Sequence, residues 1–341
     1  MKTGIVKDRI FLEHKAGLYH PESPARLEAI YGMIDGDAAF AGFPIIAPRP
    51  ATEDEIGFIH TPEYIELVRK TAGKERAALD PDTSTSARSY EVALLAAGSL
   101  LRAADFIMEG KVRNAFAFIR PPGHHAEAHR AMGFCLFNNV AVAAEHLVRN
   151  SGLKRIMIVD WDLHHGNGTQ HSFYRRKDVL YFSTHQFPYY PGTGWWNETG
   201  AGEGEGYTFN VPLTPGKTDA DYLFIFRNIL SAIAAKFQPE FIIVSAGFDI
   251  GEGDPLGGMQ VSADGFGAMA AELLGIAEAQ SRGKILFALE GGYDPGALRD
   301  GSREVLLQMA GLKPQPAVEA AASEEVKNEL APAFGLLKKY W

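Results

Sequence analysis

The sequence contains almost no cysteine. Cys135 is the single cysteine among 341 residues, so no intrachain disulfide can form and nothing indicates an oxidising compartment. It lies in the apolar run 134–137, where thiols usually pack without reacting. Long apolar runs are also absent, since none approaches the ~20 residues that a membrane span needs. Residues 1–7 lack the apolar stretch of a signal peptide. We therefore expect a cytoplasmic protein with no membrane partner.

Clustered basic charge is scarce as well. The chain carries 33 Lys and Arg against 42 Asp and Glu, a formal net charge of −9, and has no basic run long enough to follow a phosphate backbone. A nucleic-acid partner is therefore not expected. The glycine-rich stretches 291–292 and 192–206 do not match a nucleotide-binding fingerprint between a strand and a helix. The sequence shows no internal repeat and no low-complexity linker, so we expect residues 1–341 to form one domain.

Five short apolar runs, rich in β-branched and aromatic residues, predict buried parallel strands. They cover residues 115–119, 156–159, 179–182, 241–244 and 285–289. Helical periodicity separates most of them, over residues 90–109, 138–150 and 221–237. Another helix is predicted from an N-cap at Ser262 to just before Gly283. This alternation predicts an α/β fold with a parallel sheet covered on both faces.

Polar residues follow every one of these predicted strands. The five segments are 120–125, 160–166, 183–185, 245–249 and 290–294. Because α/β sheets bind ligands beyond the carboxyl ends of their strands, we expect the ionisable residues of these segments to converge on one site. The expected members are His124, His125, Asp160, Asp162, His164, Asp249 and Tyr293.

The pair Asp162 and His164 is a candidate metal site. Residues two apart in an extended segment point to the same side, and Asp249 could supply a third ligand. One imidazole and two carboxylates with an open position are typical of a catalytic metal. Zinc is the first choice, although iron(II) and cobalt(II) would also suit these ligands. A lone Asp-x-His motif more often makes a loop or cap contact, but five clusters at strand ends together favour a metal-binding role.

Two further constellations indicate catalysis. His124 and His125 follow a Pro-Pro-Gly turn that can aim both rings inward, and Asp160 and Asn167 could hold them for general acid–base chemistry. Adjacent histidines on their own are usually surface residues. Tyr293 follows two glycines, which would let its hydroxyl reach a developing oxyanion. A tyrosine that only packs is the alternative interpretation.

Several ordered motifs between His20 and Tyr293 resemble the histone deacetylase and acetylpolyamine amidohydrolase superfamily. They are residues 120–126 (RPPGHHA), 133–135 (GFC), 160–167 (DWDLHHGN), 190–194 (YPGTG), 249 (D), 253–255 (GDP) and 291–293 (GGY). Residues 20–26 (HPESPAR) resemble the class II and bacterial members. The resemblance implies a three-layer α/β/α domain around a mainly parallel sheet. It also implies a zinc-dependent deacylase that acts on an acylated lysine-like amine.

The resemblance implies a role for each matched residue. One zinc ion per chain would be held by Asp162, His164 and Asp249, with a water activated beside it. His125 would act as general base and later acid, oriented by Asn167. His124 would be an electrostatic partner paired with Asp160, and Tyr293 would polarise the acyl carbonyl. A structural potassium site would comprise Asp160, Asp162, His164, Ser183 and Thr184.

Substrate contacts are implied in the same way. The backbone carbonyl of Gly133 would accept the substrate amide N–H, while Phe134 and Tyr190 would line an acyl tunnel. Leu256 would lie near its mouth, at a position where polyamine-selective relatives carry an acid. Asn167 stands where many class I members have an acid, so His125 would lack a charged orienter.

Other functions stay open at this stage. An acetylpolyamine amidohydrolase is the nearest alternative. An arginase-type enzyme with two metals would need extra aspartates where Gly166 and Gly251 stand. A catalytically silent binder of acyl-lysine would be expected to lack Tyr293 or the histidine pair, and this sequence has both. A homo-oligomer is compatible with the sequence.

Overall fold

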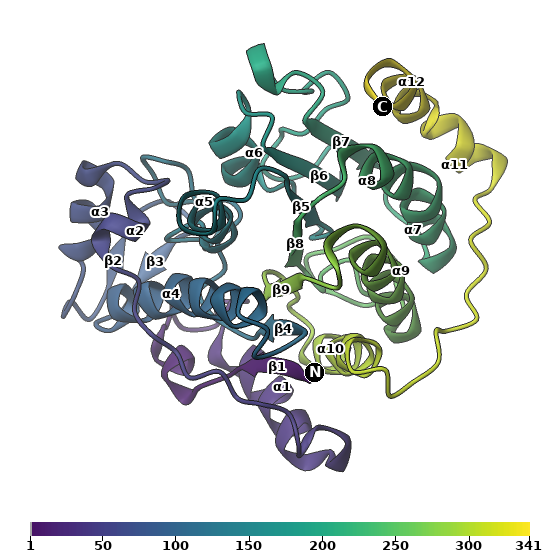
Figure 1. Ribbon diagram of the computed structural model, residues 1–341. Coiled ribbons are helices and arrows are strands. Elements are labelled where there is room, and N and C mark those ends of the chain that lie inside the picture. The colour runs from purple at the N-terminus through teal and green to yellow at the C-terminus, as the bar shows by residue number, and fades with distance from the viewer. Residues whose placement is uncertain (1) are drawn as a thin grey trace.

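The computed structural model describes residues 2–341 and is built around a seven-stranded sheet that is parallel throughout (Figure 1). Its strand order is β1-β4-β9-β8-β5-β6-β7. The strands are β1 Thr3–Val6, β4 Asn114–Ala117, β5 Ile156–Asp160, β6 Val179–Gln186, β7 Thr208–Leu213, β8 Phe241–Ala246 and β9 Ile285–Leu289. A separate antiparallel pair is formed by β2 Ala77–Ala78 and β3 Ser84–Thr85.

Helices cover both faces of this sheet (Figure 1). They are α1 Pro24–Gly36, α2 Glu53–Ile56, α3 Pro62–Arg69, α4 Ser89–Met108, α5 Asn139–Ser151, α6 Asn167–Phe173, α7 Asp219–Ile225, α8 Ser231–Phe237, α9 Ala263–Ser281, α10 Pro295–Met309, α11 Glu324–Glu329 and α12 Ala331–Tyr340. Short 3-10 helices span Arg9–Glu13, Ala38–Phe40 and Gly202–Gly204, and a π-helical turn spans Phe226–Leu230. Helices α4 and α5 lie on one side of the sheet, and α7 to α10 lie on the other. The three-layer α/β/α architecture is therefore confirmed.

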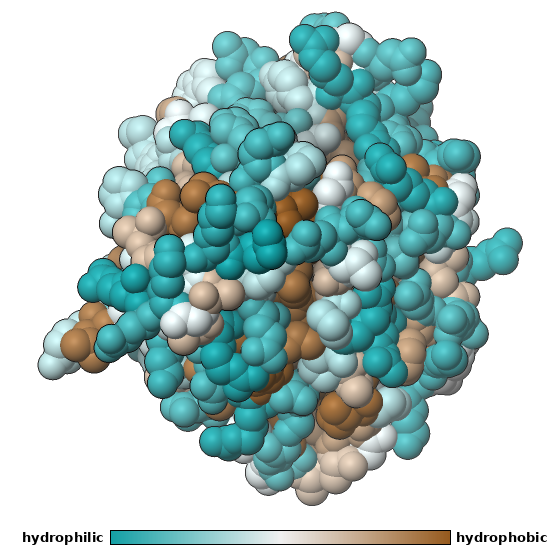
Figure 2. All heavy atoms as spheres, turned by 90° about the vertical axis from the view of Figure 1, so that its left-hand side faces the viewer, coloured by the Kyte–Doolittle hydropathy of each residue, from teal (hydrophilic) through white to brown (hydrophobic). Residues whose placement is uncertain are grey.

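The central strands β4, β5, β8 and β9 are mostly apolar because both faces of the sheet are covered. All residues of β4, β5, β8 and β9 are buried. In the surface view, hydrophilic residues cover most of the face shown, and hydrophobic residues form small separate groups (Figure 2). Among residues 2–341, every helix is too short or too polar to cross a bilayer.

The five predicted strands are all present and parallel, whereas the two edge strands were missed. Strand β1 has only four residues, and β7 contains Asn210 and Pro212, which weaken a strand pattern. Proline is tolerated at a sheet edge because its missing N–H is not needed there. The first predicted strand ends at Ala117 rather than at Ile119. The helix predicted over 221–237 is α7, the π-helical turn and α8 in succession.

The order of the strands explains where a ligand site can form. After β5 the chain moves outward to β6 and β7, and then returns to place β8 on the other side of β5. Loops leaving the carboxyl ends of β5 and β8 therefore diverge and open a crevice between them. Two of the predicted polar segments, 160–166 and 245–249, leave from this point.

Gly98 in α4 packs closely against residues 49–51, and a substitution there tests how tight this contact is. A Cβ atom at Gly98 would lie 2.2 Å from Arg49 O and 2.3 Å from Ala51 N. Backbone atoms cannot move aside cheaply, so we expect Gly98→Ala to lower the free energy of unfolding by about 1–3 kcal/mol. This loss should occur although alanine is the better helix former.

The matched control is Gly275, which is exposed in α9 and has no atom within 4 Å of its Cβ position. Gly275→Ala should raise the free energy of unfolding by about 0.5–1 kcal/mol. Denaturant unfolding measures both variants. Stabilisation by both substitutions would show that α4 does not press against residues 49–51.

Candidate functional site

Three predicted metal ligands lie together in the crevice between the loops that leave β5 and β8. Asp162 and His164 follow β5, and Asp249 follows β8. One ligand atom from each lies within 4.8 Å of the other two. His164 Nδ1 is 3.2 Å from Asp162 Oδ1 and 3.1 Å from Asp249 Oδ2. Two buried carboxylates facing one imidazole carry surplus negative charge, so this donor set fits a divalent cation.

Each group of the cluster shifts the pKa of its neighbours. Burial and the neighbouring Asp162 carboxylate raise the pKa of Asp249 to about 7. Burial alone would lower the pKa of His164, but its hydrogen bonds to Asp162 and Asp249 raise that pKa to about 9. A metal ion would displace protons from these groups, as is usual when carboxylate and imidazole ligands bind a metal.

Two glycines allow the backbone to close around the metal carboxylates. A Cβ at Gly247 would lie 2.2 Å from Asp162 Oδ2, and one at Gly291 would lie 2.2 Å from Asp249 Oδ2. The N–H of Gly291 donates to Asp162 Oδ2 at 2.8 Å, and that of Leu163 donates to Asp249 Oδ1 at 2.9 Å. Only glycine lets the chain pass this close at positions 247 and 291, and the N–H groups of Gly291 and Leu163 compensate buried negative charge.

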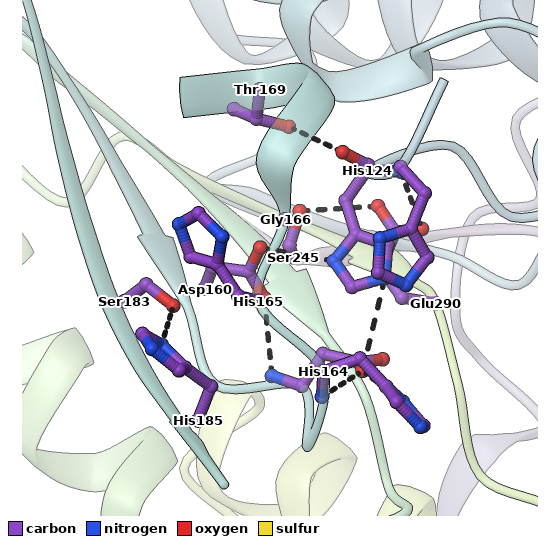
Figure 3. Close-up of polar contacts among 12 residues, drawn as sticks. His124, Asp160, His164, His165, Gly166, Thr169, Ser183, His185, Ser245 and Glu290 are labelled. Carbon is purple, nitrogen blue, oxygen red and sulfur yellow. Dashed lines mark hydrogen bonds and ion pairs between the residues drawn. The ribbon is translucent and has the colours of Figure 1, made fainter. Parts of the chain in front are cut away.

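His124 lies among carboxylates (Figure 3). Its Nδ1 is 3.1 Å from Asp160 Oδ2, which also accepts a hydrogen bond from Tyr181 at 2.9 Å. Its backbone N–H donates to Glu290 Oε2 at 3.2 Å. Burial alone would lower the pKa of His124, but the carboxylates of Asp162 and Asp160 raise it to about 10. These carboxylates therefore favour the imidazolium form of His124.

His125 has the opposite electrostatic character. Its Nδ1 is 2.8 Å from Asn167 Oδ1, so its orienting partner is neutral, as the sequence indicated. Burial, followed by the charges of His124 and His164, holds the pKa of His125 well below its ordinary value. This ring stays neutral near pH 7, and a neutral imidazole can act as a base.

A cavity of about 250 Å³ leads from the surface to these histidines. It is lined by Asp82, His125, Gly133, Phe134, His164, Tyr189, Tyr190, Leu256 and Tyr293. All four predicted substrate-contacting residues are thus on its wall. Asp82 and Tyr189 were missed. Asp82 accepts the N–H of Gly133 at 3.1 Å but follows no long strand, so no sequence pattern pointed to it.

The loop after β9, which carries Tyr293, is held by a buried arginine. Arg26 donates from Nε to Gly292 O at 2.6 Å and from a terminal nitrogen to Glu290 O at 2.5 Å. Its guanidinium lies 5.0 Å from the centre of the Tyr293 ring. Burial raises the pKa of Tyr293 well above its ordinary value, so the hydroxyl remains a donor. In the sequence, residues 20–26 carry only a family resemblance, and no pattern there predicts this role of Arg26.

The residues suggested for potassium lie on the adjacent strands β5 and β6 and in the loop after β5. Ser183 on β6 pairs in register with Asp160 on β5, and both are fully buried. Side chains alternate along a strand, so the hydroxyls of Ser183 and Thr184 face opposite sides of the sheet. Ser183 Oγ lies 2.9 Å from His185 Nδ1, a contact drawn in Figure 3. Thr184 could therefore join Ser183 around one ion only through its backbone carbonyl.

Comparison with known proteins identifies the family. Residues 20–309 match the histone deacetylase domain, and the chain belongs to the histone deacetylase family. It is 39% identical over 314 residues to a probable deacetylase of Archaeoglobus fulgidus, covering 91% of this chain and 87% of that protein. It is 42% identical over 313 residues to histone deacetylase 15 of Arabidopsis thaliana, covering 90% of this chain and 56% of that one.

Matches to longer relatives and to a solved structure support the same family. The chain is 36% identical over 375 residues to histone deacetylase HDA1 of Candida albicans, covering all of this chain and 44% of that protein. It therefore spans about half the length of these two histone deacetylases. The crystal structure of the HDA15 HD domain matches with a TM-score of 0.93 and 38% identity, covering 100% of this chain and 95% of that one. The family resemblance and the fold predicted from sequence are confirmed.

A buried carboxylate behind the loop after β9 offers a stability test. Glu22 pairs with Arg26 at 3.2 Å and also with Arg120, and all three side chains are buried. Burial alone would raise the pKa of Glu22, but Arg120 lowers it to about 2. A depressed pKa contributes stability above the ordinary value of 4.5 that is lost as the pH falls towards 2.

We expect Glu22→Gln to lower the free energy of unfolding at pH 7 by about 3–5 kcal/mol, because two buried guanidinium groups lose their carboxylate. The difference from the wild type should shrink between pH 4.5 and 2, because Glu22 takes up a proton in the unfolded chain near pH 4.5 but keeps its charge in the folded protein down to about pH 2. Glu91→Gln is the control, since Glu91 pairs with Arg88 on the surface and should matter little. If the difference in free energy of unfolding between Glu22→Gln and the wild type does not change with pH, the effect comes from packing and not from the charge of Glu22.

Proposed function

We propose that this protein is a zinc-dependent deacylase that hydrolyses the amide of an acetylated or otherwise acylated lysine-like amine. The observation that carries the proposal is the convergence of His125, Tyr293 and the metal ligand His164 on one narrow cavity. A neutral base, an oxyanion donor and a cation site on one tunnel are the parts that amide hydrolysis needs. The names of the relatives support the same reaction class.

Zinc held by Asp162, His164 and Asp249 would polarise the acyl carbonyl and lower the pKa of a water molecule. His125 would take a proton from that water at Nε2, because its Nδ1 is committed to Asn167. It would later give the proton to the leaving amine. His124, charged and held by Asp160, would add positive potential beneath the reacting carbonyl.

The remaining residues of the cavity would hold the substrate. The hydroxyl of Tyr293 would donate a hydrogen bond to the developing oxyanion. The rings of Phe134 and Tyr190 would pack along the methylene chain of the acylated amine. The carbonyl of Gly133 would accept the substrate amide N–H. A Cβ at Gly133 would lie 2.2 Å from His125 Cδ2, so only glycine allows this carbonyl to sit beside the base.

An arginase-type site with two metals fits the structure less well. A Cβ at Gly166 would lie 2.3 Å from Asp160 Oδ2 and 2.7 Å from the Tyr181 hydroxyl. A Cβ at Gly251 would lie 2.8 Å from Phe248 O. Side-chain ligands for a second ion therefore have no room at either position. Within residues 2–341, the cluster at Asp162 is the one group of three or more ligands.

A monovalent cation beside the zinc site is a secondary proposal. Asp160 and Ser183 place buried oxygen atoms on adjacent strands. The loop after β5 adds the backbone carbonyls of Asp162 and His164, and oxygen donors suit a hard cation such as potassium. Such an ion would balance part of the buried carboxylate charge without taking part in proton transfer.

The decisive test is turnover of a fluorogenic acetyl-lysine peptide by wild-type enzyme and by Tyr293→Phe. Loss of one oxyanion donor should lower kcat by about 10²–10³-fold while the zinc content stays at one per chain. Tyr189→Phe is the matched control, because this cavity tyrosine donates to Leu256 O at the rim instead. A chelator should abolish wild-type turnover. Two metals per site, or full activity in Tyr293→Phe, would contradict the proposal.

Leu256 allows the acetyl-lysine and acetylpolyamine alternatives to be separated. It lines the cavity mouth with an apolar side chain, which offers no partner to a second substrate ammonium. Leu256→Glu should shift the ratio of kcat/KM towards acetylated polyamines by up to about 100-fold, equivalent to ~1–3 kcal/mol. Leu256→Gln, uncharged and similar in size to glutamate, should shift it much less. A wild type that already prefers acetylspermidine would favour the polyamine alternative.

A further inference from the structure

Four polar side chains lead from the cavity to the surface. His125 Nδ1 is 2.8 Å from Asn167 Oδ1, and Asn167 Nδ2 is 2.5 Å from Glu127 Oε1. Glu127 Oε1 is in turn 2.8 Å from His171 Nδ1. The Glu127 side chain is 7% exposed and that of His171 is 49% exposed. Glu127 is thus a buried carboxylate one residue beyond the candidate base, and the proposed reaction does not use it.

We propose that Glu127 is a positioning residue that fixes the tautomer of His125. The inference rests on the proposed function, in which His125 is the base. A carboxylate only accepts hydrogen bonds, so Asn167 must turn its NH₂ group towards Glu127. The amide oxygen then faces His125, which must carry its hydrogen on Nδ1. Nε2 is left with a lone pair for the water in the cavity.

Glu127 is ionised and rigidly held. Burial alone would raise its pKa, but hydrogen bonds from His171 and Asn167 hold the pKa below its ordinary value. Its backbone is fixed on both sides, because its N–H donates to Arg130 O at 3.0 Å and its carbonyl lies 2.9 Å from His60 Nδ1. The carboxylate therefore keeps its charge and its place beside the amide.

Two other contacts favour the same amide orientation. Asn167 Nδ2 is also 3.3 Å from the carbonyl oxygen of His125 and 3.4 Å from the sulfur of Met132. Both are long contacts to neutral acceptors. A hydrogen bond to a carboxylate is roughly twice as strong as a neutral one, so Glu127 supplies most of the preference.

Exchanging the two side chains tests the proposal. In Glu127→Gln, the new amide can donate as well as accept, so Asn167 can turn round and His125 can populate both tautomers. We expect kcat to fall about tenfold with little change in KM, within the range seen for residues that orient a functional group. In Asn167→Asp with Glu127→Gln, the aspartate accepts from both neighbours, which restores a single tautomer and most of the lost turnover. Asn167→Asp alone places two carboxylates next to each other, so it should restore neither the single tautomer nor the turnover.

Nitrogen-15 NMR of the histidine rings in the zinc-loaded protein reads the tautomer directly, with His125→Ala assigning the signal. We expect Nδ1–H on His125 in the wild type and in the exchanged double variant, and a mixture in Glu127→Gln. His171→Gln is the control, because it changes only the exposed partner of Glu127 and should keep Nδ1–H. A pure Nδ1–H signal with unchanged kcat in Glu127→Gln would overturn the proposal. The NMR result does not depend on turnover, so failure of the deacylase assignment would be recognised separately.

Discussion

Four carboxylates are buried side by side at the carboxyl edge of the sheet, and the rest of the site depends on compensating them. Asp160, Asp162, Asp249 and Glu290 are each at most 1% exposed. An unpaired charge in a protein interior is very costly, so each carboxylate needs hydrogen-bond donors and a nearby positive charge. Backbone N–H groups supply the donors, and His124 supplies one positive charge. A divalent cation at the ligand cluster would supply the remainder, which is why a metal site and a charged histidine occur together here.

The need to compensate these carboxylates also explains the glycines at positions 247 and 291 and the buried side chain of Arg26. The chain passes beside these carboxylates without a Cβ at Gly247 and Gly291, and the N–H of Gly291 donates to Asp162. A glycine-rich loop is flexible by itself and has to be held from outside. Arg26 binds two carbonyls of the loop after β9, and Glu22 neutralises Arg26. The N-terminal segment is therefore part of the scaffold of the candidate site, although it is remote in sequence.

The sequence predicted what depends on local patterns and missed what depends on tertiary contacts. Buried central strands are continuous apolar runs, so all five were found, together with the polar residues at their ends. The edge strands β1 and β7 are short or interrupted by Asn210 and Pro212, and only their neighbours make them strands. Arg26 and Asp82 act on backbone groups of distant loops, and no spacing rule connects such partners. The roles of the site residues came from family motifs, and the structure adds their distances.

The two adjacent histidines differ because carboxylates raise the pKa of His124, whereas burial and the charges of His124 and His164 lower the pKa of His125. His124 touches Asp160 directly and is charged, whereas His125 touches only an amide and is neutral. A direct carboxylate on His125 would also define the tautomer, but it would stabilise the imidazolium and raise the pKa of the ring. No orienter at all would leave the tautomer undefined. The asparagine between His125 and Glu127 meets both requirements, because it transmits the direction of the hydrogen bond and keeps the charge one residue away. In the proposed reaction, the neutrality of the base and its tautomer are therefore set by two different residues.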